Sequence, residues 1–241
     1  MIPKRIHYVW VGGPMPDRYR VLVDHWRHLH PDWELVHWSE RNIDFSHAPL
    51  REAYRRRQWA RVSDIARLLA VHRHGGIYLD TDFKVLKPLD PLLDNQCFLS
   101  FQDSPKPSDL LANGCLGAVP GHWFIGEALE AALRLRSLPF GLDRPTRSGP
   151  KLVTRLMRRH GLRAETADVQ AEAWIGDIRI YPWRVFFPYP HGGEFTPDCI
   201  TEDTLAVHHW ERSWSASLPR HIRLAQAARS RVSRVLHSLH T

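Results

Sequence analysis

Two aspartates, Asp80 and Asp82, stand two positions apart directly after the short apolar run 77–79. Residues i and i+2 of an extended segment point the same way, so both carboxylates can face one cleft where the strand ends. Two carboxylates with open coordination positions beside them suit Mg²⁺ or Mn²⁺ held against a substrate phosphate. Acidic pairs also occur at strand ends that bind nothing, so the surrounding sequence has to decide between these interpretations.

A second candidate group lies upstream and consists of Ser63, Asp64 and Arg67. On a helix Asp64 and Arg67 would share one face, since positions three apart are neighbours. The plainer interpretation is an intrahelical ion pair that contributes about 0.3 kcal/mol. The functional interpretation is a sugar-binding pair, because a carboxylate accepts hydrogen bonds from hydroxyls and a guanidinium donates them to hydroxyls or phosphate oxygens. Spacing alone favours the ion pair.

The elements that position these groups follow from hydrophobic periodicity. We expect strands over 5–11, 33–38 and 77–79, with helices over 17–30 and 50–74, the second of which ends at Gly75-Gly76. Strands that alternate with helices imply a parallel α/β sheet, whose ligands bind beyond the carboxyl ends of the strands. Trp10 and the Asp80/Asp82 pair both lie near such ends.

The second half of the chain is less regular. We expect strands over 98–101 and 117–119 around an Asn113-Gly114 turn, helices over 123–138 and 151–160, and strands over 178–181 and 205–209. An aromatic, proline-rich loop covers 185–193. No internal repeat or linker is evident, so we expect one catalytic domain over 1–218, followed by a basic, helix-prone tail over 219–241.

Length and composition limit the classes of protein to which the chain can belong. The chain has 241 residues, of which 43% are hydrophobic and 24% charged, as in an ordinary globular domain. Its three cysteines are odd in number and far apart, which favours free thiols in a reducing compartment. No signal peptide or apolar run of about 20 residues is found, so we expect a soluble, cytoplasmic protein. The net charge of +7 is typical of proteins that meet nucleic acid, anionic membrane or phosphorylated small molecules.

Three segments in the right order carry a family resemblance: IPKRIHYVWVGG at 2–13, VSDIAR at 62–67 and GGIYLDTD at 75–82. They resemble the glycosyltransferases with a DXD sugar-binding region. That group includes fungal Golgi α-1,6-mannosyltransferases and bacterial capsular and exopolysaccharide transferases, and the large clostridial glucosylating toxins are distant relatives. Segments 113–114, 119–122, 148–150, 207–210 and 213–214 look like the later motifs. The resemblance implies an α/β, GT-A (Rossmann-like) nucleotide-sugar transferase fold with a mostly parallel central sheet.

The resemblance also implies roles for individual residues. Asp82 would ligate a divalent metal directly, Asp80 would contact the ribose and the metal's water shell, and His208 would be the late metal or diphosphate ligand, with His209 as an alternative. The residues implied to act in catalysis are Asp64, Arg67, Asp80, Asp82, Asn113 and Trp214. Those implied to bind the donor are Val9, Trp10, Ser63, Asp64, Arg67, Tyr78, Asp80, Thr81, Asp82, His209, Ser213 and Trp214.

Several of these residues have plainer interpretations. Trp10 could stack on a nucleobase, but a tryptophan at a strand end is more often part of the core. Asn113 could meet the transferring sugar or be a turn residue before Gly114. The Trp214 indole could donate to a phosphate oxygen, together with Ser213, or pack as a lid or core residue. His208 could complete a metal shell or be a buried strand histidine.

Taken together, these features predict a metal-dependent, retaining transferase of bacterial type that moves a sugar to a glycan or glycolipid. The first guess for the donor is a UDP-sugar and the second is GDP-mannose, with Mn²⁺ or Mg²⁺ as the ion. Toxin-like protein glycosylation is disfavoured because the long helical insertions of toxin domains are missing. Binding of nucleic acid is disfavoured because the arginine run 55–57 lies on a helix beside the donor site without an RNA- or DNA-binding motif.

The basic tail leaves one further alternative open. It could lie on an anionic membrane at the inner face, which would suit a lipid-linked acceptor, or it could dock on the catalytic domain.

Overall fold

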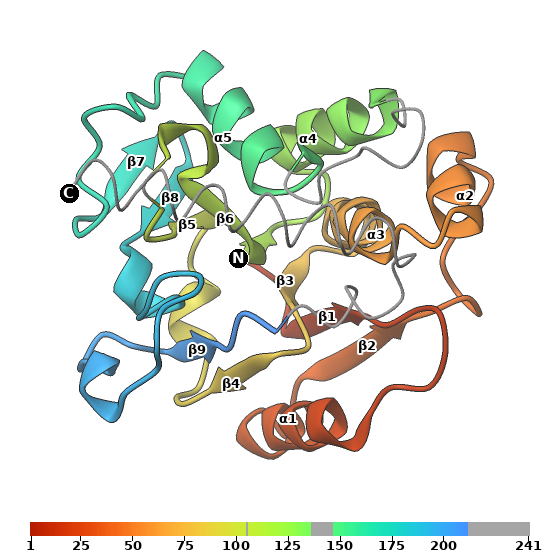
Figure 1. The fold of residues 1–241 in the computed structure, drawn as a ribbon, viewed down its shortest axis with the longest axis horizontal. Helices are drawn as coiled ribbons and strands as arrows, with labels where there is room; N and C mark the ends of the chain where they lie inside the picture. The colour runs from red at the N-terminus through yellow and green to blue at the C-terminus, as the bar shows by residue number, and fades with distance from the viewer. Residues whose placement is uncertain (105, 136–146, 212–241) are drawn as a thin grey trace, which may run out of the picture.

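The computed structural model describes residues 1–104, 106–135 and 147–211. The predicted tail over 219–241, together with Ser213 and Trp214, lies outside this part of the chain. Among the described residues a seven-stranded sheet has the order β2-β1-β3-β6-β5-β8-β7, and a small second sheet pairs β4 with β9 (Figure 1). The strands are β1 (Arg5–Val9), β2 (Glu34–Trp38), β3 (Gly76–Leu79), β4 (Phe83–Val85), β5 (Cys97–Phe101), β6 (Leu111–Ala118), β7 (Ala173–Ile175), β8 (Ile178–Tyr181) and β9 (Ala206–His208).

The large sheet is mostly parallel. Strand β1 pairs in parallel with β2 and β3, and β5 pairs in parallel with β8. Strands β6 and β7 run antiparallel to their neighbours. The N-terminal β1–α1–β2 and β2–helix–β3 crossovers therefore have the predicted topology, and the predicted α/β class with a mostly parallel sheet is confirmed.

The predicted helix over 50–74 is wrong as a single element, because two helices occupy it: α2 (Ala48–Arg55) and α3 (Trp59–His74). Arg57 has a φ of 54°, and the N–H groups of Arg57 and Gln58 donate to the carbonyls of Tyr54 and Ala53. This pair of bonds is a Schellman motif, which ends a helix at a left-handed residue. Glycine usually occupies this left-handed position. Because arginine occupies it here, the sequence pattern did not predict the end of the helix.

The predicted Asn113-Gly114 turn is also wrong, since both residues lie inside β6. Strand β6 runs from residue 111 to 118, and its pairing with β5 shifts register between Phe98 and Ser100. Helix α4 (Trp123–Arg134) and helix α5 (Pro150–Arg159) begin close to the predicted positions. The predicted strand over 178–181 is confirmed as β8, and that over 205–209 is confirmed as the shorter β9.

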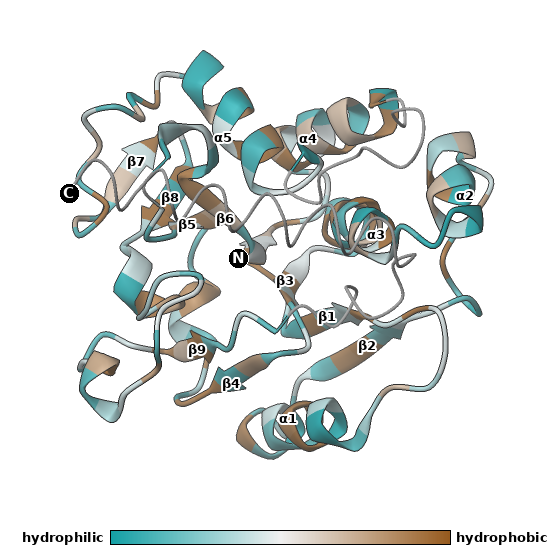
Figure 2. Cartoon of the chain, in the orientation of Figure 1, coloured by the Kyte–Doolittle hydropathy of each residue, from teal (hydrophilic) through white to brown (hydrophobic). Residues whose placement is uncertain are grey.

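The sheet separates two hydrophobic clusters. One lies between the sheet and helices α3, α4 and α5, with Val71, Phe124 and Leu156 among its buried members. The other lies on the opposite face beneath α1 (Asp17–Leu29) and the β4–β9 sheet, around Trp26 and Phe83. Figure 2 shows hydrophilic residues on the outer sides of the helices, where they meet water. Helix α3 is therefore held between the sheet and α2 and α4, and even its charged residues Asp64 and Arg67 are buried.

Two sequence-based expectations concern smaller features. Cys97, Cys115 and Cys199 are free thiols, and the first two are buried. Within the described residues, none of the helices combines the length and apolar character needed to cross a membrane.

Candidate active site

The two aspartates lie at the carboxyl end of β3, where the chain turns into β4. The Asp80 backbone N–H donates to the Gly114 carbonyl at 2.8 Å, and the Phe83 N–H donates to the Asp80 carbonyl at 3.2 Å. This anchoring fixes the turn against β6. Thr81 and Asp82 are buried, whereas Asp80 remains partly exposed. The two carboxylates thus have unequal surroundings.

Strand β9 brings a histidine to this turn. Phe83 of β4 is the antiparallel partner of His208, so the imidazole lies directly beside Asp82. Its Nε2 atom is 3.1 Å from Asp82 Oδ1 and 3.9 Å from Asp80 Oδ2. One ligand atom from each of the three residues lies within 4.8 Å of the others. Two carboxylates and one imidazole are a donor set that fits a divalent cation such as Mn²⁺, with further positions left for phosphate oxygens.

Charge balance stabilises the ionised forms here. Burial alone would lower the pKa of His208, but the adjacent Asp82 carboxylate raises that pKa above the ordinary value. Burial would likewise raise the pKa of Asp82, yet His208 and the Glu211 backbone N–H hold that pKa below its ordinary range. The Nδ1 atom of His208 is buried without a hydrogen-bond partner among the described residues. The side chain is therefore held through Nε2, the atom that faces the carboxylates.

The segment 208–211 wraps around Asp82. The His209 N–H donates to the Asp82 carbonyl at 3.1 Å, and the Glu211 N–H donates to Asp82 Oδ2 at 2.8 Å. Between them Trp210 has a φ of 55°, which is unusual for a bulky residue. The Trp210 indole N–H donates to the Tyr189 carbonyl at 2.9 Å, which helps to hold this conformation. Strained backbone of this kind gathers at functional sites.

Glu211 connects the segment to the predicted base-stacking residue. The Tyr19 hydroxyl donates to Glu211 Oε2 at 2.6 Å, and Arg18 forms an ion pair with the same carboxylate. The Trp10 ring lies against the Tyr19 ring, with centroids 4.9 Å apart, and remains half-buried. Trp10 is thus fixed near the Asp82 turn while part of its surface stays open. Tyr19 and Glu211 could not be chosen as partners from spacing, because they lie 192 positions apart.

Arg67 lies at the centre of the second group. Its guanidinium donates to Ser63 Oγ at 3.0 Å and to the Asn113 carbonyl, and it pairs with Asp80 Oδ1 at 3.1 Å. It also lies over the Tyr78 ring, 4.4 Å from the centroid. The Tyr78 hydroxyl in turn donates to Asp80 Oδ1 at 2.7 Å. The contact with Asp64 on the same helix is longer, at 3.4 Å, so the closer partners of Arg67 are Ser63 of α3, Asp80 directly after β3 and the Asn113 carbonyl of β6.

Asp64 is held by groups from elsewhere in the chain. Its two carboxylate oxygens accept from Asn113 Nδ2 at 2.7 Å and from Ser148 Oγ at 2.6 Å. Burial raises the pKa of Asp64, although Arg67 opposes this shift. A Cβ atom on Gly149 would lie 2.7 Å from Asn113 Nδ2, so glycine at this position leaves room for the amide. The Ser148-Gly149 pair, which the sequence offered only as a motif, is part of the site.

The structure therefore brings most of the predicted residues together but not all. Ser63, Asp64, Arg67, Tyr78, Asp80 and Asn113 share one set of contacts, and Asp82 and His208 lie beside it. Val9 is buried among core residues. The His209 imidazole lies against the Phe195 ring, outside the group of Asp80, Asp82 and His208.

Part of the chain matches a known protein family. Residues 16–99, about a third of the chain, match the family described as glycosyltransferase sugar-binding region containing DXD motif. The matched segment includes the Ser63-to-Arg67 turn and both aspartates. This segment is a DXD-type glycosyltransferase sugar-binding region. The DXD region does not supply the whole site, because Asn113, Ser148 and the segment 208–211 lie beyond it.

Two proteins named as glycosyltransferases are similar to this chain in sequence. Inositol phosphoceramide mannosyltransferase 1 of Schizosaccharomyces pombe is 29% identical over 139 residues, which cover 54% of this chain and 42% of that protein. Human alpha-1,4-N-acetylglucosaminyltransferase is 34% identical over 104 residues, covering 42% of this chain and 27% of that protein. The chain thus spans less than half the length of either relative.

The solved PaToxG glycosyltransferase has a TM-score of 0.52 at 18% identity, over 66% of this chain and 69% of that chain. At this identity the likeness concerns the fold, and it confirms the GT-A fold expected around the DXD region.

Proposed function

We propose that the protein is a metal-dependent, retaining glycosyltransferase that moves a sugar from a nucleotide-diphosphate sugar to a hydroxyl of a glycan or glycolipid. The observation that carries the proposal is the close approach of Asp80, Asp82 and His208, whose ligand atoms lie within 4.8 Å of one another. The buried pair of Asp64 and Arg67 adjoins this group through the contact between Arg67 and Asp80. A metal-diphosphate site beside a sugar-binding pair is the arrangement that such a reaction needs.

In this proposal Asp80, Asp82 and His208 hold the divalent ion. When bound, the ion supplies positive charge that stabilises the negative charge developing on the departing diphosphate. Trp10 offers its open surface to the nucleobase. These groups bind what all nucleotide-diphosphate sugars share, so they favour neither a UDP-sugar nor GDP-mannose.

Asp64 and Arg67 bind and orient the transferred sugar. The Asp64 carboxylate, held by Asn113 and Ser148, accepts a hydrogen bond from a sugar hydroxyl, and the Arg67 guanidinium adds fixed positive charge beside the diphosphate. The carboxylate oxygens of Asp64 are both engaged, which suits a positioning role better than nucleophilic attack. We therefore favour attack by the acceptor oxygen on the anomeric carbon from the face that the diphosphate leaves. The new C–O bond forms as the bond to phosphate breaks, and the acceptor proton passes to a phosphate oxygen.

The relatives guide the choice of acceptor. Their names include a mannosyltransferase acting on inositol phosphoceramide and an N-acetylglucosaminyltransferase. This range supports a glycan or glycolipid acceptor and leaves the sugar open.

The test is a hydrolysis assay on a panel of nucleotide sugars with Mn²⁺, with Asp82→Asn beside the wild type. We expect one donor to release its sugar far faster than the others, and the variant to lose at least about a hundredfold in rate, as expected for the loss of a central electrostatic group. If no nucleotide sugar is cleaved, or if Asp82→Asn matches the wild type, the proposed function is wrong. Product stereochemistry, read by NMR, separately decides between retention and inversion.

A further inference from the structure

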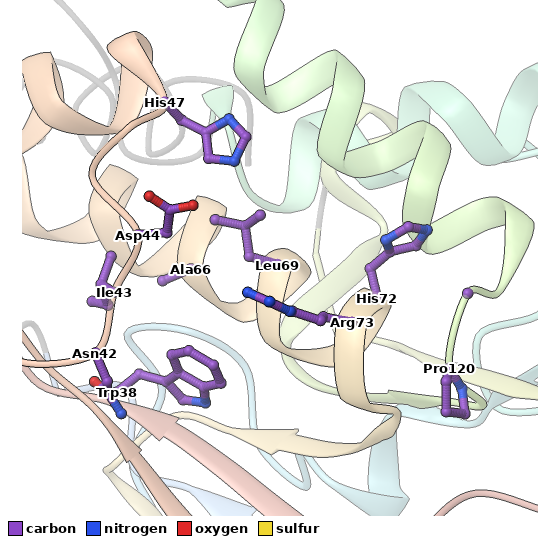
Figure 3. Close-up of a pocket in the computed structure, with 11 residues that line it drawn as sticks. Trp38, Asn42, Ile43, Asp44, His47, Ala66, Leu69, His72, Arg73 and Pro120 are labelled. Carbon is purple, nitrogen blue, oxygen red and sulfur yellow. The ribbon is translucent and has the colours of Figure 1, made fainter.

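A cavity lies beside α3, the helix that carries Asp64 and Arg67. It has a volume of about 590 Å³ and lies between the loop that follows β2, the second half of α3 and the connection from β6 to α4 (Figure 3). This volume is within the roughly 300–1,000 Å³ that is common for small-molecule sites. Its lining residues are Trp38, Asn42, Ile43, Asp44, His47, Ala66, Leu69, His72, Arg73, Pro120 and Gly121.

This cavity is separate from the candidate active site. An α-helix turns by about 100° per residue, which places Leu69 about 160° and Arg73 about 120° around α3 from Arg67. Arg67 faces β3 and β6 through its contacts with Asp80 and Asn113. Leu69 and Arg73 instead line the cavity (Figure 3). The helix therefore stands between the two sites, and a ligand in the cavity would not compete for the groups that hold the donor.

The cavity wall combines apolar surface with polar groups of both kinds. Trp38, Ile43 and Leu69 supply the apolar part, and Asp44, His47 and Arg73 supply acceptors and donors. Arg73 is exposed and forms no hydrogen bond or ion pair with any residue that the structure describes. The hydrogen bonds described for the Asp44 side chain come from the nearby Ser46, whose backbone N–H donates at 2.9 Å and whose side chain also contributes. The formal charges of Asp44 and Arg73 cancel.

These properties define the ligand by its chemistry. A nucleotide or a phosphate would need clustered cationic donors, whereas among these lining residues the one arginine is opposed by one aspartate, and the other ring donors are the imidazoles of His47 and His72. A purely apolar ligand would leave Asp44 and Arg73 without partners. A pyranose ring matches the wall, because its C–H face can pack on Trp38 and Leu69 while its hydroxyls both donate to Asp44 and accept from Arg73.

We propose that this cavity is a non-catalytic binding site for a neutral pyranose unit of a glycan. Binding of a pyranose at this site does not depend on the transfer reaction. We infer that the site anchors a glycan chain whose end is extended on the other side of α3, and this role rests on the proposed function. An anchor of this kind would add its binding energy to that of the acceptor end and raise the local concentration of the chain.

Saturation-transfer NMR with methyl α-D-mannopyranoside, methyl α-D-glucopyranoside and methyl α-D-galactopyranoside tests the site, with UDP and the diamagnetic ion Mg²⁺ present so that the donor site is occupied. Leu69→Trp fills the cavity, and Val21→Trp is its matched control because Val21 is 66% exposed on α1. Arg73→Gln removes the charged guanidinium from the cavity wall, and Arg55→Gln makes the same change on exposed α2. Because Arg73 is exposed, its variant tests the site even if Leu69→Trp disturbs α3.

We expect at least one glycoside to bind the wild type and both control variants. Leu69→Trp should weaken that binding by at least about tenfold, and Arg73→Gln should weaken it by about threefold or more. UDP affinity should stay the same in all four variants. The inference is overturned if no glycoside binds the wild type, or if binding survives in Leu69→Trp and Arg73→Gln. If a glycoside binds but no nucleotide sugar is hydrolysed, the proposed function is wrong and the proposed binding site is still supported.

Discussion

The Tyr19 hydroxyl is the anchor whose removal should weaken metal and nucleotide binding without damaging the fold. It donates to Glu211 at 2.6 Å, and the Glu211 backbone N–H donates to the Asp82 carboxylate at 2.8 Å. Tyr19→Phe removes this donor and keeps the buried ring against which Trp10 lies. The segment 208–211, which includes His208, then loses one of its two contacts with α1 and keeps the ion pair between Arg18 and Glu211.

The size of the effect follows from the contact. A hydrogen bond to a charged group contributes about 1.5–3 kcal/mol, and the solvent around the partly exposed Glu211 carboxylate reduces this to about 1 kcal/mol. If most of that energy holds Asp82 and His208 in place, Mn²⁺ affinity should fall by about fivefold. Affinity for UDP measured with Mn²⁺ should fall by a similar factor.

Isothermal titration of Mn²⁺, and then of UDP, measures both affinities directly. Tyr54→Phe is the matched control, because the Tyr54 hydroxyl also donates to a glutamate, Glu40, at 3.1 Å and lies away from the metal-binding group. Both variants should unfold in urea within about 1 kcal/mol of the wild type. The reasoning fails if Tyr19→Phe binds Mn²⁺ as the wild type does, or if Tyr54→Phe shows the same loss.

Three further predictions test other parts of the site and the core. Arg67→Gln leaves Asp80 and the Asn113 carbonyl without their buried cation, so it should unfold about 3 kcal/mol more easily in urea and lose UDP binding. Gly114→Ala would place a Cβ atom 2.8 Å from Asp80 Oδ2, so it should lower Mn²⁺ affinity while the circular dichroism spectrum stays unchanged. Burial lowers the pKa of His7 to about 4, against about 6.5 when unfolded. The unfolded chain thus binds more protons between these values, and His7 should cost about 3 kcal/mol of stability as the pH falls from 6.5 to 4. Urea unfolding at several pH values should show that the free energy of unfolding depends less steeply on pH in His7→Gln than in the wild type. The same pH dependence in both proteins would contradict the lowered pKa of His7.

The sequence predicted well those elements whose hydrophobic period was undisturbed. Strands β1, β2 and β3 and helix α1 lie where the pattern places them, within a few residues. The break between α2 and α3 was not predicted because its left-handed residue is Arg57, and arginine does not mark a helix end as glycine does. Asn113-Gly114 resembled a turn by composition, yet tertiary contacts hold it as strand: Gly114 leaves room for the Asp80 carboxylate, and Asn113 donates to Asp64.

The residues of the candidate site also fall into those that the sequence predicted and those that it did not. Residues close in sequence, such as Asp80 with Asp82 and Asp64 with Arg67, could be chosen from spacing. The contact between His208 and Asp82 joins residues far apart, and only the resemblance to a family suggested it. Tyr19 and Glu211 had neither kind of support, because their meeting depends on how segment 208–211 turns at Trp210. Long-range partners of this kind are decided by packing, which single-sequence patterns do not encode.

The two aspartates of the DXD region are tied to different parts of the chain, and this suggests how the site is assembled. Asp80 is held by Arg67 of α3 and Tyr78 of β3, both of which belong to the family-matched segment. Asp82 is held by His208 and Glu211, which approach it from the far end of the described chain. A chain ending before residue 206 would keep the partners of Asp80 and lose those of Asp82. The matched sugar-binding region alone therefore contains the acidic pair without the contacts that bring His208 beside Asp80 and Asp82.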